Sequence, residues 1–164
     1  MDFDPGAAAL AGLLAGVVMI ATRLVIRAAG VDLRMDVLRM WSTMFRIHGA
    51  PGRWFGMGMH LLVSVVVGVV YALGLRYLFN ATDAYWLWGL LGAAIHYVIA
   101  GAFLTIAPEM NPEMPQRIPA PGPFATKLGG ADVGGFLAGH LTYGVSFAIL
   151  YALLHPAGGA SVAF

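Results

Sequence analysis

Four long apolar stretches divide the chain, and each is long enough to cross a bilayer as a helix. They run approximately over residues 6–28, 55–79, 85–107 and 133–154. A bilayer core of about 30 Å requires roughly 20 apolar residues in helical conformation. Because lipid offers no hydrogen bonds, backbone groups must pair within each helix, which excludes open strands. The pattern predicts an all-α integral membrane protein with four transmembrane helices, forming a single domain over residues 1–164.

Residues 32–47 break this pattern with a more polar, amphipathic segment. Its apolar positions recur at helical spacing, while the arginines fall on the opposite face. Such a segment is too polar to span a bilayer, but it can lie in the interface with its arginines against anionic lipid. We therefore expect an in-plane helix here, ended by the Gly-Ala-Pro-Gly sequence at 49–52 before the second spanning helix begins.

The remaining connections also have distinct compositions. Residues 80–83 form a short polar turn, which predicts a tight hairpin between the second and third spanning helices. Residues 108–131 contain six of the nine prolines in the chain, a composition that disfavours regular helix. We expect an extended Pro-rich loop here, followed by Asp132 as the N-cap of the fourth helix.

Two of the apolar stretches resemble copies of one another. From His60 the sequence reads HLLVSVVVGVVYAL, and from His140 it reads HLTYGVSFAILYAL. In both, the Tyr-Ala-Leu sequence follows eleven residues after the histidine, at Tyr71 and Tyr151. Helical periodicity places each histidine and its tyrosine on one stripe. A weaker match joins GLLAGVVM from residue 12 to GLLGAAIH from residue 89, so we predict two parallel hairpin repeats, 6–79 and 85–155, related by an axis along the membrane normal.

Composition supports a membrane protein and excludes several kinds of chemistry. Hydrophobic residues make up 60% of the chain and charged residues 10%, with a mean hydropathy of +0.80. The net charge is +1, and no basic run with interleaved aromatic residues occurs, so nucleic acid is not an expected partner. The chain has no cysteine, which excludes disulfides, zinc thiolate sites and cysteine nucleophiles. The acidic first residues are unlike a secretory signal peptide.

The distribution of basic residues predicts an orientation in the membrane. Eight of the nine lie on the side that holds the end of the first helix, the in-plane helix and the Pro-rich loop, and only Arg76 lies on the other side. By the positive-inside rule, the loops before the second and fourth spanning helices are cytoplasmic and both termini are outside. We expect a multi-pass protein of the cell inner membrane, with the lipid bilayer as its first partner.

The repeated segments and the loop between them carry a family resemblance. Gly58-Met59-His60-Leu61 and Gly139-His140-Leu141, joined through Pro112-Glu113-Met114-Pro115 and Pro121-Gly122-Pro123-Phe124, resemble the small uncharacterised four-helix proteins of bacterial inner membranes. The resemblance covers most of the chain. It implies the four-helix topology and no particular activity.

The repeat predicts that His60 and His140 lie at equal depth and can point at the same place. Two neutral imidazoles on facing helices can hold one haem b iron as axial ligands. Arg23 or Arg53 would then pair with the propionates. Arg23 lies about a turn deeper than Arg27, and we expect it to snorkel towards the headgroups unless it finds a partner.

A transition metal such as copper is the second kind of ligand that this site suggests. Met57, Met59 and His60 offer thioether and imidazole donors close together in the sequence, to which His140 could add a second imidazole. Methionine also packs irregular membrane interfaces without binding anything. Because thiols of a reducing cytoplasm compete with thioethers for copper, haem is the preferred hypothesis.

Two further hypotheses do not require a bound metal. A small proton-linked transporter or channel could use His60, His96, His140 and Glu109 as relay groups. Alternatively, the chain is a non-catalytic accessory subunit of a larger membrane complex or a homo-oligomer, in which the histidines bond neighbouring helices. Close-packing faces for such a partner would be the glycines at 12, 16, 135 and 139. No nucleophile-base pair or paired intramembrane carboxylate occurs, so we do not expect an enzyme.

Overall fold

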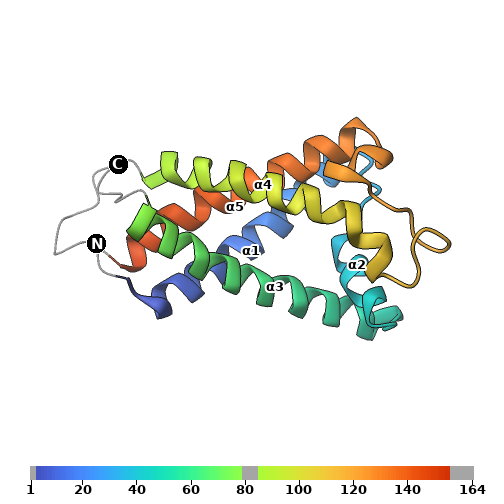
Figure 1. Cartoon of the computed structure of the whole chain (residues 1–164), viewed down its shortest axis with the longest axis horizontal. Coiled ribbons are helices and arrows are strands. Elements are labelled where there is room, and N and C mark those ends of the chain that lie inside the picture. Colours follow the sequence, from blue (N-terminus) through green and yellow to red (C-terminus); the bar gives the residue numbers. More distant parts are fainter. Residues whose placement is uncertain (1–2, 79–84, 156–164) are drawn as a thin grey trace.

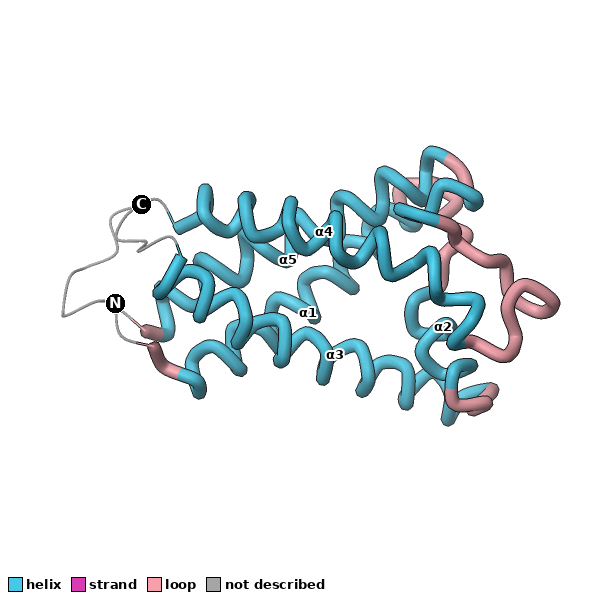
Figure 2. The backbone as a smooth tube through the Cα atoms, viewed as in Figure 1, coloured by secondary structure: helices cyan, strands magenta, loops and turns pink. Residues whose placement is uncertain are grey.

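The computed structural model describes residues 3–78 and 85–155, which form a bundle of long helices (Figure 1). Within these ranges the chain consists of helices, turns and loops, with no strand (Figure 2). In chain order, the elements are α1 (Pro5–Ala28), α2 (Val37–Met44), α3 (Gly49–Leu73), the π-helix η1 (Gly74–Leu78), α4 (Tyr85–Met110), the 3-10 helix η2 (Pro123–Leu128) and α5 (Gly130–Leu154).

Four helices are long and apolar enough to cross a membrane: α1, α3 continued into η1, α4 and α5. This confirms the predicted all-α class with four helices of transmembrane length. The turn at 80–83, expected to make the hairpin between the second and third of these helices, lies outside the described residues.

The most extensive contacts between the long helices are those of α1 with α3, α1 with α5, and α4 with α5. Helix α1 is therefore the common neighbour of α3 and α5. The start of α1 meets the end of α5, where the backbone N–H of Asp4 donates to the Tyr151 hydroxyl at 3.2 Å. The opposite end of the bundle carries α2 and the loop that follows α4 (Figure 1).

Glycine permits the closest helix approaches. A Cβ atom at Gly12 of α1 would lie 2.6 Å from the carbonyl oxygen of Ser64 on α3. A Cβ atom at Gly89 of α4 would lie 2.5 Å from the carbonyl oxygen of Gly144 on α5. Small residues let helix backbones come this close, and the gain in van der Waals contact drives helix association in lipid.

The two faces of helix α3 carry different kinds of side chain. Leu62, Val66 and Val70 are exposed on one face, whereas His60 and Ser64 are buried on the other. Apolar side chains pointing outward and polar or small ones pointing inward are the arrangement that a lipid environment favours. The helix therefore places its ionisable group inside the bundle.

The helix expected over residues 32–47 is shorter than predicted, because α2 spans only Val37–Met44. The Asp36 carboxylate accepts a hydrogen bond from the backbone N–H of Arg39 at 3.1 Å and so caps the helix at its start. Before this cap, the backbone N–H groups of Arg34 and Met35 donate to Asp132 instead of continuing a helix.

The predicted break at 49–52 is also wrong, since these residues form the first turn of α3. Pro51 fits there because the first helical turn does not need its missing N–H group. The chain turns earlier, between the end of α2 and His48, which is the N-cap residue of α3. Helix α4 likewise continues through Pro108 to Met110, which shortens the expected Pro-rich loop.

Asp132 does not cap the fourth spanning helix, as the sequence suggested. Helix α5 begins at Gly130 with Gly129 as its N-cap residue, so Asp132 lies in its first turn. There the carboxylate is 1% exposed and accepts hydrogen bonds from the backbone of Met35 at 2.8 Å and of Arg34 at 3.1 Å. It fixes the segment between α1 and α2 to the start of α5.

Candidate functional site: a buried histidine and tyrosine cluster

His60 lies on the inner face of α3 and is 7% exposed. Its ring lies beside the backbone of Gly16 on α1, a helix that packs on both α3 and α5. Its Nε2 atom is buried and has no hydrogen-bond partner. This nitrogen is thus left available inside the bundle.

His140 of α5 is held by a hydrogen bond within its own helix. Its Nδ1 atom lies 2.7 Å from the backbone carbonyl oxygen of Phe136. Because a carbonyl oxygen can only accept, Nδ1 is the protonated nitrogen, and Nε2 of the neutral ring keeps a lone pair. A second-sphere carbonyl bond of this kind is the usual way in which proteins orient a metal-ligating histidine.

His96 of α4 completes a group of three imidazoles. Its ring centroid lies 4.6 Å from that of His140, with the ring planes 75° apart. Its buried Nδ1 atom has no hydrogen-bond partner. The three rings are also close enough for a charge on one to act on the others. The sequence suggested His96 only as a relay group, and the structure brings it into direct contact with His140.

Two tyrosines continue the cluster. The ring of Tyr71 lies 6.0 Å from His96 and 5.6 Å from Tyr143, and its buried hydroxyl has no hydrogen-bond partner. Tyr143 is 1% exposed, and its hydroxyl donates to the carbonyl oxygen of Ser64 at 2.6 Å. The sequence analysis missed Tyr143, although its position three residues after His140 puts both on one face of α5.

Arg23 does not snorkel to the membrane surface, as we had expected. It is 7% exposed, and its guanidinium donates to the carbonyl oxygen of Met35 at 2.5 Å. Asp132 and Asp36 lie near enough to offset its charge. Arg27 donates to the Leu33 carbonyl oxygen at 2.9 Å. The segment after α1 therefore folds back over both arginines, so that Arg23 has a partner inside the chain.

The other candidates lie apart from the cluster. Met59 directly precedes His60, and adjacent helical residues point about 100° apart, whereas Met57 lies three residues before His60 on the same side of α3; both methionines are partly buried. Glu109 is exposed in the last turn of α4, about 20 Å along the helix from His96 at 1.5 Å per residue. Tyr151 bonds Asp4 at the far end of the bundle.

The glycines considered as faces for a partner subunit are occupied within the chain. Cβ atoms at Gly12 and Gly16 would meet Ser64 on α3. Cβ atoms at Gly135 and Gly139 would meet side chains of Leu33 and Met19. These glycines therefore give no argument for an external partner.

The part of the chain that the structure describes contains no group of three or more histidine, aspartate or glutamate side chains placed to hold a metal ion. The cluster thus offers imidazoles singly or in pairs. Comparison of the chain with protein-family models, with curated proteins and with solved structures finds no match.

Proposed function

We propose that the chain is a multi-pass membrane protein that binds haem or a transition metal through His60 and His140. The observation that carries this proposal is the buried Nε2 of His60, which has no hydrogen-bond partner in the structure. The Nδ1–H of His140 is occupied by the carbonyl oxygen of Phe136, which leaves its Nε2 lone pair available. A buried polar atom left unsatisfied costs about 1–3 kcal/mol, and a Lewis acid is one partner for imidazole lone pairs.

The number of available ligands favours some metals over others. Structural zinc requires four protein ligands and catalytic zinc three, and no such group occurs among the described residues. Haem iron would need no more than two ligands from the protein, here His60 and His140, because the porphyrin would supply the rest. When bound, haem would supply one-electron redox chemistry. Cu(I), which soft and imidazole ligands accept, is the alternative.

The two-repeat organisation forms part of this proposal. In the alignment of 6–79 with 85–155, Gly12 corresponds to Gly89 and Ser64 to Gly144. Two close backbone approaches, from Gly12 to Ser64 and from Gly89 to Gly144, are therefore equivalent under the repeat. Equivalent helix pairing supports equivalent positions for His60 and His140.

The orientation in the membrane is likewise proposed. The end of the bundle that holds α2 and the loop after α4 carries most of the basic residues, which supports a cytoplasmic location for this end and external termini. The short α2 would lie in the interface of the inner membrane, with Arg39 on its exposed face.

The test is an optical spectrum with metal analysis on the detergent-purified protein from cells supplied with haem precursor and metals. We expect a Soret band or stoichiometric metal that is lost in His60→Ala and in His140→Ala. His48→Ala is the matched control, because His48 is exposed outside the spanning helices. A colourless and metal-free preparation, or a ligand retained in both cluster variants, would overturn the proposal.

Proton transfer through the cluster is a second candidate, favoured by the partnerless Nδ1 of His96 and hydroxyl of Tyr71. With Tyr143, these groups line the interior from α3 to α5. Imidazole and phenol groups can each accept and donate a proton. In liposomes under a pH gradient, this candidate predicts a proton flux that His96→Ala abolishes and His48→Ala preserves. Equal flux in liposomes without protein would exclude it.

A further inference from the structure

A second site lies at the end of the bundle that carries α2. The last residues before α3 and the loop after α4 enclose a cavity of 360 Å³, lined by Arg46, His48, Pro112, Glu113, Gln116 and Arg117. None of these residues belongs to the histidine and tyrosine cluster. Four of the six carry an ionisable side chain: Arg46, His48, Glu113 and Arg117.

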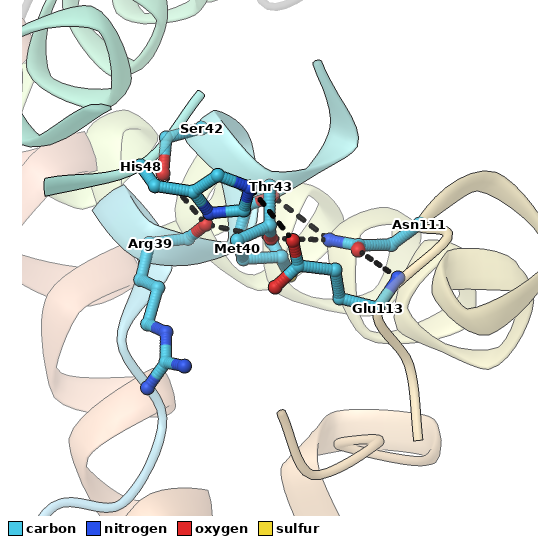
Figure 3. A network of polar contacts seen from close by, with 7 residues as sticks. All are labelled: Arg39, Met40, Ser42, Thr43, His48, Asn111 and Glu113. Carbon is cyan, nitrogen blue, oxygen red and sulfur yellow. Dashed lines mark hydrogen bonds and ion pairs between the residues drawn. The ribbon is translucent and has the colours of Figure 1, made fainter. Parts of the chain in front are cut away.

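The charges around this cavity do not cancel. His48 Nε2 lies 3.2 Å from the Glu113 carboxylate, so the negative group of the cavity wall has a polar partner (Figure 3). Within the described chain, the guanidinium groups of Arg46 and Arg117 make no hydrogen bond or ion pair. Two cationic groups thus face a cavity whose carboxylate already has a partner.

Buried hydrogen bonds of Asn111 hold the segment that carries Glu113 in place. Asn111 is 1% exposed, and its amide donates to the Met40 carbonyl oxygen at 3.0 Å and to the Thr43 hydroxyl at 2.8 Å. Its side-chain oxygen accepts from the backbone N–H of Glu113 at 3.1 Å (Figure 3). The loop after α4 is therefore fixed to α2, which keeps the cavity in shape before any ligand arrives.

Arg46 adds a second argument, because its backbone is strained. Its φ angle is +58°, in the left-handed region that residues other than glycine rarely occupy. The turn is stabilised by the backbone N–H of Arg46, which donates to the Thr43 carbonyl oxygen at 3.0 Å. Glycine would relieve this strain, so an arginine here indicates a use for its side chain.

We propose that this cavity binds a phosphate group, supplied either by a lipid headgroup or by a soluble phosphate. The planar guanidinium presents paired N–H donors that match phosphate oxygens, and the two guanidiniums outnumber the single carboxylate that lines the cavity, which favours an anion. The cavity lies where helices of membrane-spanning length end, so a headgroup phosphate can reach it from the interface.

The test is isothermal titration calorimetry on the full chain in a phosphate-free maltoside detergent. The titrants are dihexanoyl phosphatidic acid, its phosphate-free counterpart dihexanoylglycerol, and inorganic phosphate. We expect the double variant Arg46→Gln/Arg117→Gln to bind the phosphatidic acid at least about tenfold more weakly, as for the loss of charged hydrogen bonds. Arg117→Gln alone avoids the strained position 46, and it should weaken binding in the same direction.

The matched control is Arg53→Gln, which removes an exposed arginine of α3 that does not line the cavity. Binding of phosphatidic acid alone supports a lipid headgroup, and binding of inorganic phosphate as well supports a soluble phosphate ligand. The proposal is overturned if dihexanoylglycerol binds as well as the phosphatidic acid, if no titrant binds, or if Arg53→Gln weakens binding as much as the double variant.

Discussion

The hydroxyl of Tyr143 on α5 donates a hydrogen bond of 2.6 Å to the backbone carbonyl oxygen of Ser64 on α3. These two helices share α1 as a close neighbour, and this side chain reaches from one to the other. Its acceptor, Ser64, lies between His60 and Tyr71 along α3. The bond therefore crosses the interior of the bundle beside the histidine and tyrosine cluster.

Removal of this hydroxyl should loosen the bundle. We expect Tyr143→Phe to lower the free energy of unfolding by about 1 kcal/mol, the usual value for one hydrogen bond. Unfolding of the detergent-solubilised protein by SDS, followed by circular dichroism, measures the change. Tyr77→Phe is the control, because Tyr77 is 70% exposed. Equal effects of the two substitutions would mean that the interhelical bond contributes nothing.

The close approach of α1 and α3 predicts a strong effect of a single methyl group. In Gly12→Ala, the new Cβ would lie 2.6 Å from the Ser64 carbonyl oxygen and 2.9 Å from the Gly68 Cα. Both neighbours are backbone atoms, so a helix must shift, and we expect a loss of about 1–3 kcal/mol.

Gly58→Ala is the matched control in the same SDS titration. No atom lies within 4 Å of a Cβ placed at Gly58, which lies within α3. An alanine there should raise stability by about 0.5–1 kcal/mol through its better helix propensity. Similar losses in both variants would contradict close packing at Gly12.

Asp132 should be the most sensitive carboxylate of the chain. Asp132→Ala removes the acceptor of two backbone N–H groups and a negative charge near the buried Arg23. We expect a loss of about 3 kcal/mol, because a buried donor or charge left without its partner is costly. The exposed Asp32 is the control, since Asp32→Ala should leave the thermal midpoint unchanged. A thermal midpoint of Asp132→Ala equal to that of the native protein would contradict this role.

Acid should weaken the start of α1. The hydrogen bond from the Ala7 backbone N–H holds the pKa of the Asp4 carboxyl below its usual 3.8. Because the folded pKa is the lower one, the stabilisation is present above pH 3.8 and is lost as the pH falls through the folded value.

Asp4→Asn removes the titrating carboxyl while asparagine still caps the helix, and it also removes the pairing of this carboxyl with His155 at 3.7 Å. The thermal midpoint of the native protein should fall more steeply than that of Asp4→Asn on acidification from about pH 5 to pH 3. Parallel pH profiles of the two proteins would show that Asp4 makes no pH-dependent contribution.

Prediction of structure from the sequence succeeded where a contiguous stretch of residues determines the local structure. The four helices of transmembrane length follow from apolar runs, because lipid requires each helix to satisfy its own backbone. It failed where a distant residue determines local structure. Asp132 resembles an N-cap by its position, but Arg34 and Met35, about a hundred residues earlier, bind its carboxylate. Arg23 likewise finds its partner in a segment that folds back over α1.

The residues of the candidate site also fall into two groups: those that the sequence identifies and those that only the packing of the helices reveals. Histidine placed in an apolar helix is costly, so His60, His96 and His140 could be selected from the sequence alone. Which of them meet depends on how the helices pack, and periodicity within one helix contains no such information. The contact of His96 with His140 and the addition of Tyr143 are results of that packing. The cavity of Arg46 and Arg117 also required the tertiary structure, since it joins residues about 70 positions apart.

The sequence by itself thus determined the class of the protein, the four helices of membrane-spanning length and the ionisable residues inside them, because hydrophobicity and helical period are local properties. The tertiary structure decided which helices touch, which imidazole nitrogens are occupied and which are left free. Those features depend on glycine-mediated backbone contacts and on hydrogen bonds between distant segments, which form only when the helices are brought together.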